Sequence, residues 1–311
     1  MPYELSSINS RAISDPSGFI QECDAAYQKK IEVAADKIIE NIKNSPIVLL
    51  SGPSGSGKTT TASKIREELR RRGVNTHSIA MDDYFRSRDT YSVPLTPEGT
   101  FDLESPLCVD MELLNEHFTL LHKGKTVLVP KFDFSRQMRI IEPSRALRLE
   151  KDEIAIFEGI HALNDSITDV HPEAFKLYIS ARSDVMNGDI LSFKGTWMRL
   201  VRRTVRDNLF RGADAAATLG MWANVRRGEK SHISPFKDKA NLMFDSSFPY
   251  EVCVLKNLAA DLFSSVSDGI ERFAELSEVL PAFTMFKDIS PALLAPDSLL
   301  REFVGGGIYD C

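Results

Sequence analysis

A short glycine-rich stretch constrains the fold of this chain more than any other feature. Residues 52–60 read GPSGSGKTT and directly follow the apolar run IVLLS. They match G-x-x-x-x-G-K-[ST], in which glycines let backbone N–H groups turn inward around phosphate oxygens while the next helix adds its positive N-terminal dipole. The stretch therefore predicts a buried strand, a phosphate-binding loop and a helix. The residues expected to hold a nucleoside triphosphate are Gly52, Ser54, Gly55, Ser56, Gly57, Lys58, Thr59 and Thr60.

Two side chains of this loop have separate expected roles. Lys58 can reach the outer phosphates, and the Thr59 hydroxyl can ligate Mg²⁺. ATP and Mg²⁺ are therefore the expected cofactors, although no base-reading residue separates ATP from GTP. A plain Gly/Ser-rich turn is the alternative interpretation, and the complete motif with its flanking strand and helix disfavours it.

Short apolar runs alternate with helical patterns along the rest of the chain. This alternation predicts a mainly parallel sheet covered on both faces, in an α/β P-loop NTPase-type three-layer sandwich. A helical lid and helical N- and C-terminal extensions complete the expected fold. Strands are expected at 47–50, 76–81, 126–129, 153–157, 175–179, 241–244 and 251–255, and helices at 18–43, 59–72, 111–122, 257–278 and over most of 194–230. Active residues of such a fold gather beyond the C-terminal ends of the strands.

Composition and charge exclude several classes of partner. The net charge of −6 disfavours nucleic acid and anionic membranes. No apolar run is long enough to span a bilayer, and the first residues lack the basic start and apolar core of a signal peptide. The four cysteines form no CxxC pair, which argues against a zinc site or a disulfide framework. We therefore expect a cytoplasmic protein with no membrane partner.

Carboxylates follow two of the expected strands. The segment AMDDYF places Asp82 and Asp83 after the strand at 76–81, and EIAIFEGIH places Glu158 at the exit of the strand at 153–157. One aspartate can accept the proton of a hydroxyl while the other faces away. Glu158 can hold Mg²⁺ directly or through water. The alternatives are an acidic turn or helix cap for the aspartates and an ordinary exposed carboxylate for Glu158.

Residues 199–212, RLVRRTVRDNLFRG, carry a dense run of arginines. Arg199, Arg202, Arg203 and Arg206 are spaced i, i+3, i+4 and i+7, so they share one face of a helix. Like charges this close repel each other, and a lid that closes over transferring phosphates would give them an anionic partner. A solvated basic face is one alternative, and RNA binding is another that the acidic total charge disfavours.

Taken together, these segments resemble the uridine kinase/phosphoribulokinase family of P-loop kinases, in particular its bacterial uridine kinase-like branch. The resemblance covers roughly residues 45–256, and the tail SLLREFVGG at 298–306 is similar to the ending of that branch. It implies an N-terminal helical extension at 1–44, a P-loop kinase domain at 45–256 with a lid at about 194–230, and a C-terminal helical tail at 257–311. Uridine kinases are often tetrameric, so the resemblance allows a homo-oligomer.

The resemblance also implies roles for individual residues. Asp82 matches the catalytic acidic residue, with Lys58 and Arg206 as further catalytic residues. Glu158 matches the metal-associated glutamate and would share Mg²⁺ with Thr59. The remaining lid arginines, Arg203 and Arg211, match positions that contact the substrate and the nucleotide phosphates, respectively.

The acceptor pocket is implied by two further segments. Asp102 in TFDLESP matches an aspartate that grips sugar hydroxyls, and VPKFDFSRQMR resembles the wall of the base pocket. In that wall Phe132 stands where uridine kinases usually have tyrosine, Phe134 keeps the aromatic, and Gln137 replaces a histidine. Ala213 falls where those kinases often have another arginine. These changes remove or alter hydrogen-bonding groups that read a pyrimidine, so the acceptor stays open.

The expected activity is ATP- and Mg²⁺-dependent phosphoryl transfer to a small-molecule hydroxyl, here the 5′-OH of a uridine- or cytidine-like nucleoside. A sugar-phosphate kinase of phosphoribulokinase type is one alternative. A nucleotide-binding regulatory module without small-molecule kinase activity is the other. Core packing is the alternative interpretation of Phe132 and Phe134.

Overall fold

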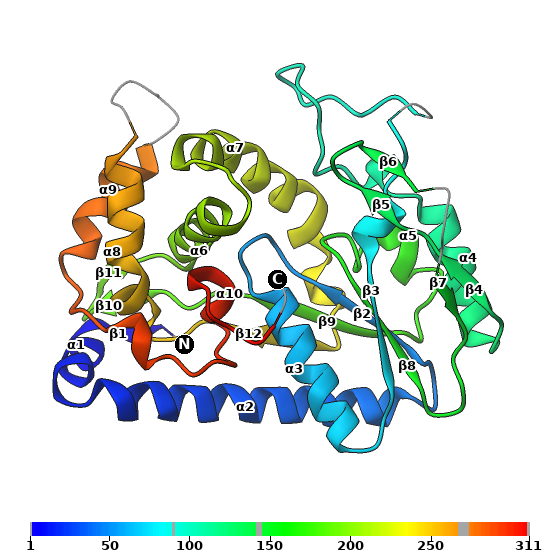
Figure 1. Cartoon of the computed structure of the whole chain (residues 1–311), viewed down its shortest axis with the longest axis horizontal. Coiled ribbons are helices and arrows are strands. Elements are labelled where there is room, and N and C mark those ends of the chain that lie inside the picture. Colours follow the sequence, from blue (N-terminus) through cyan, green and yellow to red (C-terminus); the bar gives the residue numbers. More distant parts are fainter. Residues whose placement is uncertain (1, 89–90, 141–144, 267–273, 310–311) are drawn as a thin grey trace.

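A five-stranded parallel sheet forms the centre of the computed structural model, which describes residues 2–88, 91–140, 145–266 and 274–309 (Figure 1). The strand order is β12-β9-β2-β8-β3, and every neighbouring pair is parallel. The bounds are β2 (Ile47–Ser51), β3 (Thr76–Ala80), β8 (Ile154–Glu158), β9 (Phe175–Ser180) and β12 (Leu242–Asp245). The α/β P-loop NTPase-type sandwich expected from the sequence is confirmed.

Alternate residues of the central strand β2 pack into two separate cores, because successive side chains point to opposite faces of a sheet. Val48 and Leu50 belong to one core, and Ile47 and Leu49 belong to the other. The first core is covered by α2 (Pro16–Asn41), α3 (Lys58–Arg71), α6 (Gly195–Phe210) and α8 (Glu251–Ser264). The second is covered mainly by α4 (Met111–His122), with α5 (Asp165–Thr168) beside it. Both faces of the sheet are therefore buried, as a parallel sheet requires.

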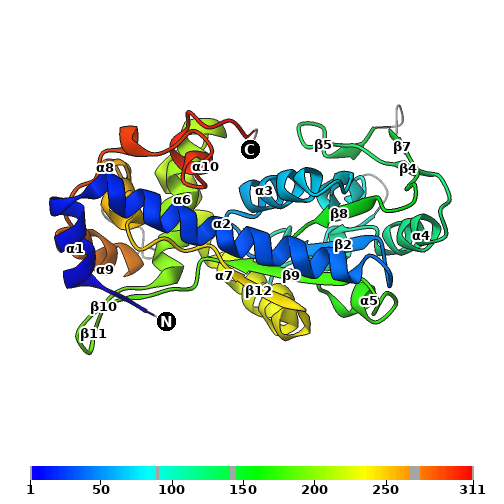
Figure 2. The same cartoon turned by 90° about the horizontal axis from the view of Figure 1, so that it is seen from below.

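The N-terminal part of the chain runs along the outside of the first core (Figure 2). The long α2 is the helix expected at 18–43. It is preceded by α1 (Leu5–Ser14), which the helical pattern did not reveal. Asp15 separates the two helices and caps α2 by accepting a hydrogen bond from the Gly18 amide. Upstream, β1 (Tyr3–Glu4) joins β10 (Val185–Asn187) and β11 (Ile190–Phe193) in a small three-stranded sheet.

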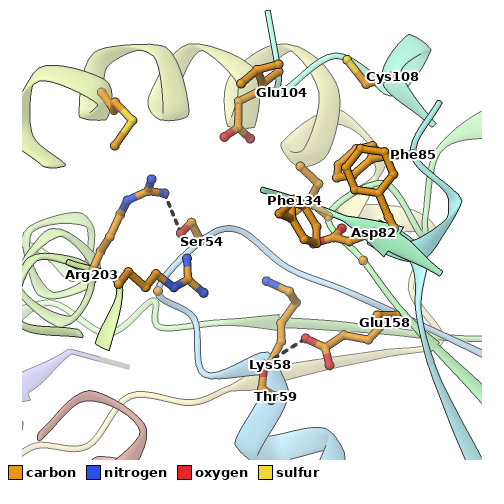
Figure 3. Close-up of a pocket in the computed structure, with 18 of the residues that line it drawn as sticks. Ser54, Lys58, Thr59, Asp82, Phe85, Glu104, Cys108, Phe134, Glu158 and Arg203 are labelled. Atoms are coloured by element: carbon orange, nitrogen blue, oxygen red, sulfur yellow. Dashed lines mark hydrogen bonds between the residues drawn. The ribbon is translucent and has the colours of Figure 1, made fainter. Parts of the chain in front are cut away.

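Two small antiparallel sheets lie beyond the β3 edge of the central sheet. The strand expected at 126–129 is β4 (Val127–Val129), and it pairs with β7 (Arg145–Leu147) rather than with the central sheet. Next to it, β5 (Phe132–Asp133) pairs with β6 (Met138–Arg139). The short 3-10 helices η1 (Met81–Tyr84) and η2 (Pro106–Cys108) lie in the same region. This part of the molecule faces the phosphate-binding loop across a cavity (Figure 3).

The prediction of a strand at 251–255 is wrong, because these residues begin α8. After Glu251 the run is apolar, and all five residues are buried; such a short apolar run fits a buried helix as well as a strand. Of the helix expected at 257–278, the first part lies in α8, residues 267–273 lie outside the described residues, and α9 (Ala274–Phe283) follows. The expected domain boundary at residue 256 falls inside α8.

The remaining helices flank the phosphate-binding loop. After α6 come α7 (Ala215–Gly228), a π-helical turn at Glu229–Ile233 and a 3-10 helix at Ser234–Lys239. The C-terminal segment contains η6 (Pro291–Leu293) and α10 (Arg301–Val304), and α10 packs against α6 next to the loop (Figure 1). Within the described ranges, no helix combines the length and apolar character that a membrane span requires.

Candidate active site

The loop between β2 and α3 has the backbone conformation that a phosphate site needs. Gly55 and Gly57 have φ angles of +74° and +76°, which side-chain-bearing residues rarely adopt. At Gly52, a Cβ atom would lie 2.0 Å from the Ile179 carbonyl oxygen, so only glycine fits between the loop and β9. No side chain caps α3 at Gly57, and the positive end of the α3 dipole faces the loop.

A cavity of about 760 Å³ opens beside this loop at the C-terminal edge of the sheet (Figure 3). It brings together most of the residues expected at the site, from segments far apart in the sequence. Those that line it are Ser54, Gly55, Ser56, Gly57, Lys58, Thr59, Asp82, Phe132, Phe134, Gln137, Glu158, Arg203, Arg206 and Arg211. Gly52, Thr60 and Asp102 are the expected residues outside this lining.

Thr59 and Glu158 form a pair of oxygen donors suited to Mg²⁺. The Thr59 hydroxyl donates to the Glu158 carboxylate across 3.3 Å. Burial raises the pKa of Glu158, and the nearby Lys58 opposes that rise. Among the residues that the structure describes, no three His, Cys, Asp or Glu side chains form a metal-binding group. Mg²⁺ usually takes one or two protein oxygens and completes its shell with phosphates and water, and Thr59 and Glu158 could supply those protein oxygens.

Of the two neighbouring aspartates, Asp82 lines the cavity. Its carboxylate opens into the cavity, yet the enclosing walls exclude enough water to raise its pKa above the ordinary aspartate range. Asp83 instead accepts a hydrogen bond from the Phe132 amide at 3.2 Å and lies 3.4 Å from the Lys131 ammonium. Asp82 is therefore the aspartate placed to meet an acceptor hydroxyl.

The arginine row of α6 divides into two pairs. Arg199 and Arg202 are fully buried and do not line the cavity. Their guanidinium groups contact Glu229 at 2.6 Å and Glu251 at 2.7 Å, respectively. Carboxylates of the chain itself, rather than a bound anion, therefore balance this pair. Arg203 faces the cavity instead, and its guanidinium donates to the Ser54 hydroxyl at 2.8 Å.

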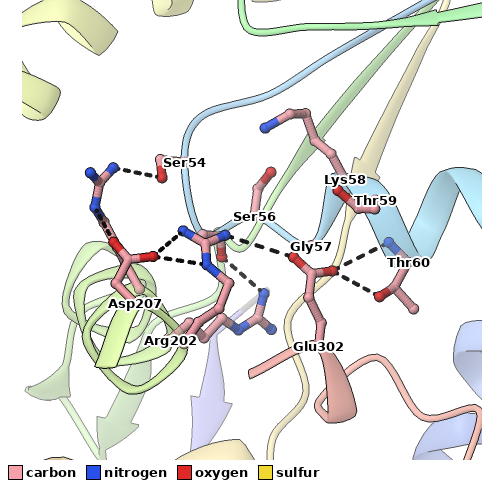
Figure 4. A network of polar contacts seen from close by, with 12 residues as sticks. Ser54, Ser56, Gly57, Lys58, Thr59, Thr60, Arg202, Asp207 and Glu302 are labelled. Carbon is pink, nitrogen blue, oxygen red and sulfur yellow. Dashed lines mark hydrogen bonds and ion pairs between the residues drawn. The ribbon is translucent and has the colours of Figure 1, made fainter. Parts of the chain in front are cut away.

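Asp207 connects the arginines that do reach the cavity (Figure 4). Its buried carboxylate lies 3.2 Å from Arg203, 2.9 Å from Arg206 and 3.6 Å from Arg211. Asp207 is not among the site residues expected from the sequence. Its position four residues after Arg203 and four before Arg211 was the available signal, because such spacing brings side chains together on a helix.

An aromatic cluster lines the cavity wall formed by η1 and the β5–β6 hairpin. The rings of Phe85, Phe132 and Phe134 contact one another edge to face, with centroids 5.1–6.1 Å apart. Gln137 lines the same wall with a φ of +56°, and its amide donates to the Phe134 carbonyl at 2.7 Å. The rings offer flat apolar surface, and Gln137 directs its amide nitrogen to its own hairpin.

The segment TFDLESP contributes a different carboxylate from the expected one. Asp102 is bound by both terminal nitrogens of Arg227, at 3.0 and 3.1 Å, and lies outside the cavity lining. Glu104, two residues later, directs its carboxylate into the cavity (Figure 3). Burial raises the pKa of Glu104, and Arg203 opposes that rise. Because both carboxylates belong to one short segment, the sequence alone did not separate them.

The parallel sheet, the phosphate-binding loop and the ring of lysine, arginine and carboxylate groups around one cavity define a P-loop kinase that acts on a small molecule. The sequence profile of the Phosphoribulokinase / Uridine kinase family matches residues 47–251, and the chain belongs to this family.

Individual relatives agree with this assignment. The chain is 29% identical over 204 residues to a uridine kinase of Macrococcus caseolyticus, covering 65% of this chain and 88% of the relative. It is 27% identical over 213 residues to a uridine kinase of Staphylococcus haemolyticus, covering 68% and 92%. Its fold is similar to that of a Silicibacter protein assigned as a fructose transport system kinase, with a TM-score of 0.52 at 20% identity over 69% of this chain and 98% of that one.

Proposed function

We propose that this kinase transfers the γ-phosphate of ATP, with Mg²⁺, to the 5′-OH of a uridine- or cytidine-like nucleoside. One observation carries the proposal: the phosphate-binding loop, the Thr59–Glu158 pair, Asp82 and the aromatic cluster all line a single cavity. A triphosphate on the loop and a flat acceptor between the rings would meet beside Asp82.

Each polar group of the cavity has a role in this reaction. Lys58 binds the outer phosphates, and Thr59 with Glu158 would hold Mg²⁺, which neutralises phosphate charge when bound. Asp82 accepts the proton of the attacking hydroxyl. Arg203 and its neighbours Arg206 and Arg211 balance the charge of the group in transfer. Catalysis of this kind depends chiefly on positioning and electrostatics.

The nucleoside acceptor is supported by the chemistry of the opposite wall. The Phe134 ring is 55% exposed and provides surface on which a base can stack, with the buried Phe132 ring packed against it. The Glu104 carboxylate faces the same space and can accept hydrogen bonds from ribose hydroxyls. Uridine kinases are named among the relatives at 27–29% identity, which supports the same class of acceptor.

A phosphorylated sugar is the second candidate acceptor, and two cationic residues favour it. Arg86 and Arg88 line the acceptor side of the cavity, where a neutral nucleoside would need no positive charge. The Arg88 guanidinium lies 5.4 Å from the Phe101 ring centroid, and Arg86 lies 3.7 Å from Asp110. Guanidinium groups bind phosphate in well-directed, charge-assisted hydrogen bonds.

ADP release measured with Mg²⁺-ATP over a panel of acceptors tests these candidates. The panel contains uridine, cytidine, other nucleosides, ribulose 5-phosphate, simple sugars and a blank without acceptor. We expect release above the blank with uridine or cytidine. Release with the sugar phosphate alone would favour the second candidate, and equal release in every well would indicate hydrolysis instead of transfer.

We further propose that the catalytic unit is residues 45–256, with the segments at 1–44 and 257–311 packed on it. The C-terminal segment contributes Glu302 to the cavity lining, so it belongs to the functional unit.

A further inference from the structure

The C-terminal segment, residues 298–306, packs directly against the phosphate-binding loop. The Leu299 side chain lies 2.7 Å from the place where a Cβ on Gly57 would sit. Next to it, Glu302 extends its carboxylate to the first turn of α3 (Figure 4). One carboxylate oxygen accepts hydrogen bonds from the Thr60 amide at 3.2 Å and from the Thr60 hydroxyl at 2.8 Å.

The donors that Glu302 occupies are those that this motif offers to a nucleotide. Backbone N–H groups of the loop and of the first helical turn cradle the inner phosphates of a bound triphosphate. The Glu302 carboxylate oxygen therefore stands in for a phosphate oxygen at Thr60. Its other oxygen lies 4.0 Å from Arg206, a cation of the same cavity. The Glu302 carboxylate thus lies against a backbone amide and an arginine, the two kinds of group that would bind phosphate.

This contact is held by an apolar anchor. Leu300 and Phe303, on either side of Glu302, are fully buried, and Glu302 itself is only 7% exposed. The Arg202 guanidinium lies 5.1 Å from the Phe303 ring centroid. Two anions at one set of donors repel each other strongly where little water screens them. A phosphate and the Glu302 carboxylate therefore exclude each other at Thr60.

We propose that Glu302 competes internally with the nucleotide, so that binding of a triphosphate expels its carboxylate and loosens the segment 298–306. The proposal rests on the ATP-dependent activity proposed above. The C-terminal segment then acts as a latch. Closed, it fills part of the phosphate site; open, it leaves Thr60 and Arg206 to the nucleotide. The apparent affinity for nucleotide is then reduced by the fraction of molecules in the closed state.

Nucleotide affinity of a charge-removing variant tests the latch. Glu302→Gln keeps the shape of the side chain but removes the charge that binds Thr60 and Arg206. Asp297→Asn is the matched control. Asp297 directly precedes the segment 298–306, is half-exposed, and pairs with Lys64 at 2.6 Å. The dissociation constant of a Mg²⁺-bound, non-hydrolysable ATP analogue is measured by calorimetry for the wild type and for both variants.

We expect Glu302→Gln to bind the analogue at least about threefold more tightly than the wild type, and Asp297→Asn to stay within about twofold of it. Unchanged or weaker binding by Glu302→Gln overturns the latch, as does an equal gain in Asp297→Asn. If neither the wild type nor Glu302→Gln binds nucleotide, the proposed function fails and the latch fails with it. If the wild type binds the analogue, a failure of the latch can be told apart from a failure of the proposed function.

Hydrogen exchange on the wild-type protein gives a second test that needs no variant. We expect backbone amides in 298–306 to lose protection when the ATP analogue is added, while amides of the loop at 52–60 gain it. Unchanged or increased protection of 298–306, together with gained protection of the loop, would show that nucleotide binds without opening the latch and would overturn the proposal.

Discussion

The Asp207 carboxylate and the Arg206 guanidinium form a buried ion pair beside the phosphate-binding loop, with two guanidinium nitrogens donating to one carboxylate oxygen at 3.1 and 2.9 Å. The same carboxylate also lies 3.2 Å from Arg203. The positive groups of this wall are therefore oriented before any phosphate arrives. Such preorganisation makes electrostatic stabilisation effective, because little reorganisation is needed during the reaction.

Asp207→Asn should lower turnover more than it weakens nucleotide binding. The substitution leaves Arg203 and Arg206 without their shared counter-charge, so their guanidinium groups lose their fixed orientation. We expect kcat to fall by about tenfold or more and the free energy of unfolding to fall by roughly 3 kcal/mol. Steady-state kinetics and urea denaturation check these two effects. Wild-type kcat in a folded variant would contradict the role given to Asp207.

Asp82→Asn should bind ATP but lose most of its turnover. An amide cannot take the proton of the acceptor hydroxyl, and general base catalysis contributes on the order of 10²–10⁴-fold. The matched control is Asp83→Asn, since Asp83 contacts Lys131 and lies outside the cavity lining. Comparable losses in the two variants would argue against Asp82 as the base.

Lys58→Ala should weaken both triphosphate binding and turnover, because we propose that Lys58 contacts the outer phosphates in the ground state and during transfer. Lys64→Ala, on the same helix but outside the cavity lining, serves as the control because Lys64 pairs with Asp297 instead. Calorimetry gives the affinities, and ADP release gives the rates. An unchanged ATP affinity in Lys58→Ala would contradict the phosphate-binding role of the loop.

The pH dependence of kcat/KM for the acceptor should show an acidic limb from Asp82. Burial raises the pKa of this carboxyl above its ordinary value of 3.8. Only the ionised form accepts a proton, so activity falls as the pH drops through the raised pKa. The midpoint should therefore lie above 3.8 at saturating ATP. If the residual activity of Asp82→Asn shows the same acidic limb, the group that titrates is not Asp82.

Stability should also fall in mildly acidic solution because of His161. Burial lowers the pKa of this imidazole from 6.5 to about 4 in the folded protein. Between these values the unfolded chain binds a proton that the folded protein does not, so the free energy of unfolding decreases as the pH falls from 6.5 toward 4. The loss reaches about 3 kcal/mol. Denaturation of the wild type and of His161→Gln over this range should show a smaller pH dependence in the variant.

The nucleotide half of the site was predictable because its signals are local. The motif at 52–60 fixes a loop between adjacent elements, and the strand-end rule places Glu158 and Asp82 at the same edge of the sheet. The apolar run at 251–255 was misread because burial alone does not separate a short strand from a buried helix.

The partners of charged residues were not predictable, because they come from distant parts of the chain. Arg202 is balanced by Glu251, and Thr60 is bound by Glu302, which is 242 residues away in sequence. Glu104 rather than Asp102 lines the cavity, likewise because of a distant residue: Arg227, on α7, binds Asp102. Only tertiary packing brings these pairs together.

Identification of the reaction product is the most direct test of phosphoryl transfer to the 5′-OH of a nucleoside. The wild-type protein is incubated with Mg²⁺-ATP and uridine or cytidine, and phosphorus NMR with mass spectrometry follows the transferred group. We expect a nucleoside 5′-monophosphate that accumulates in step with ADP. ADP accompanied by inorganic phosphate alone, with no phosphomonoester on either nucleoside, would contradict it.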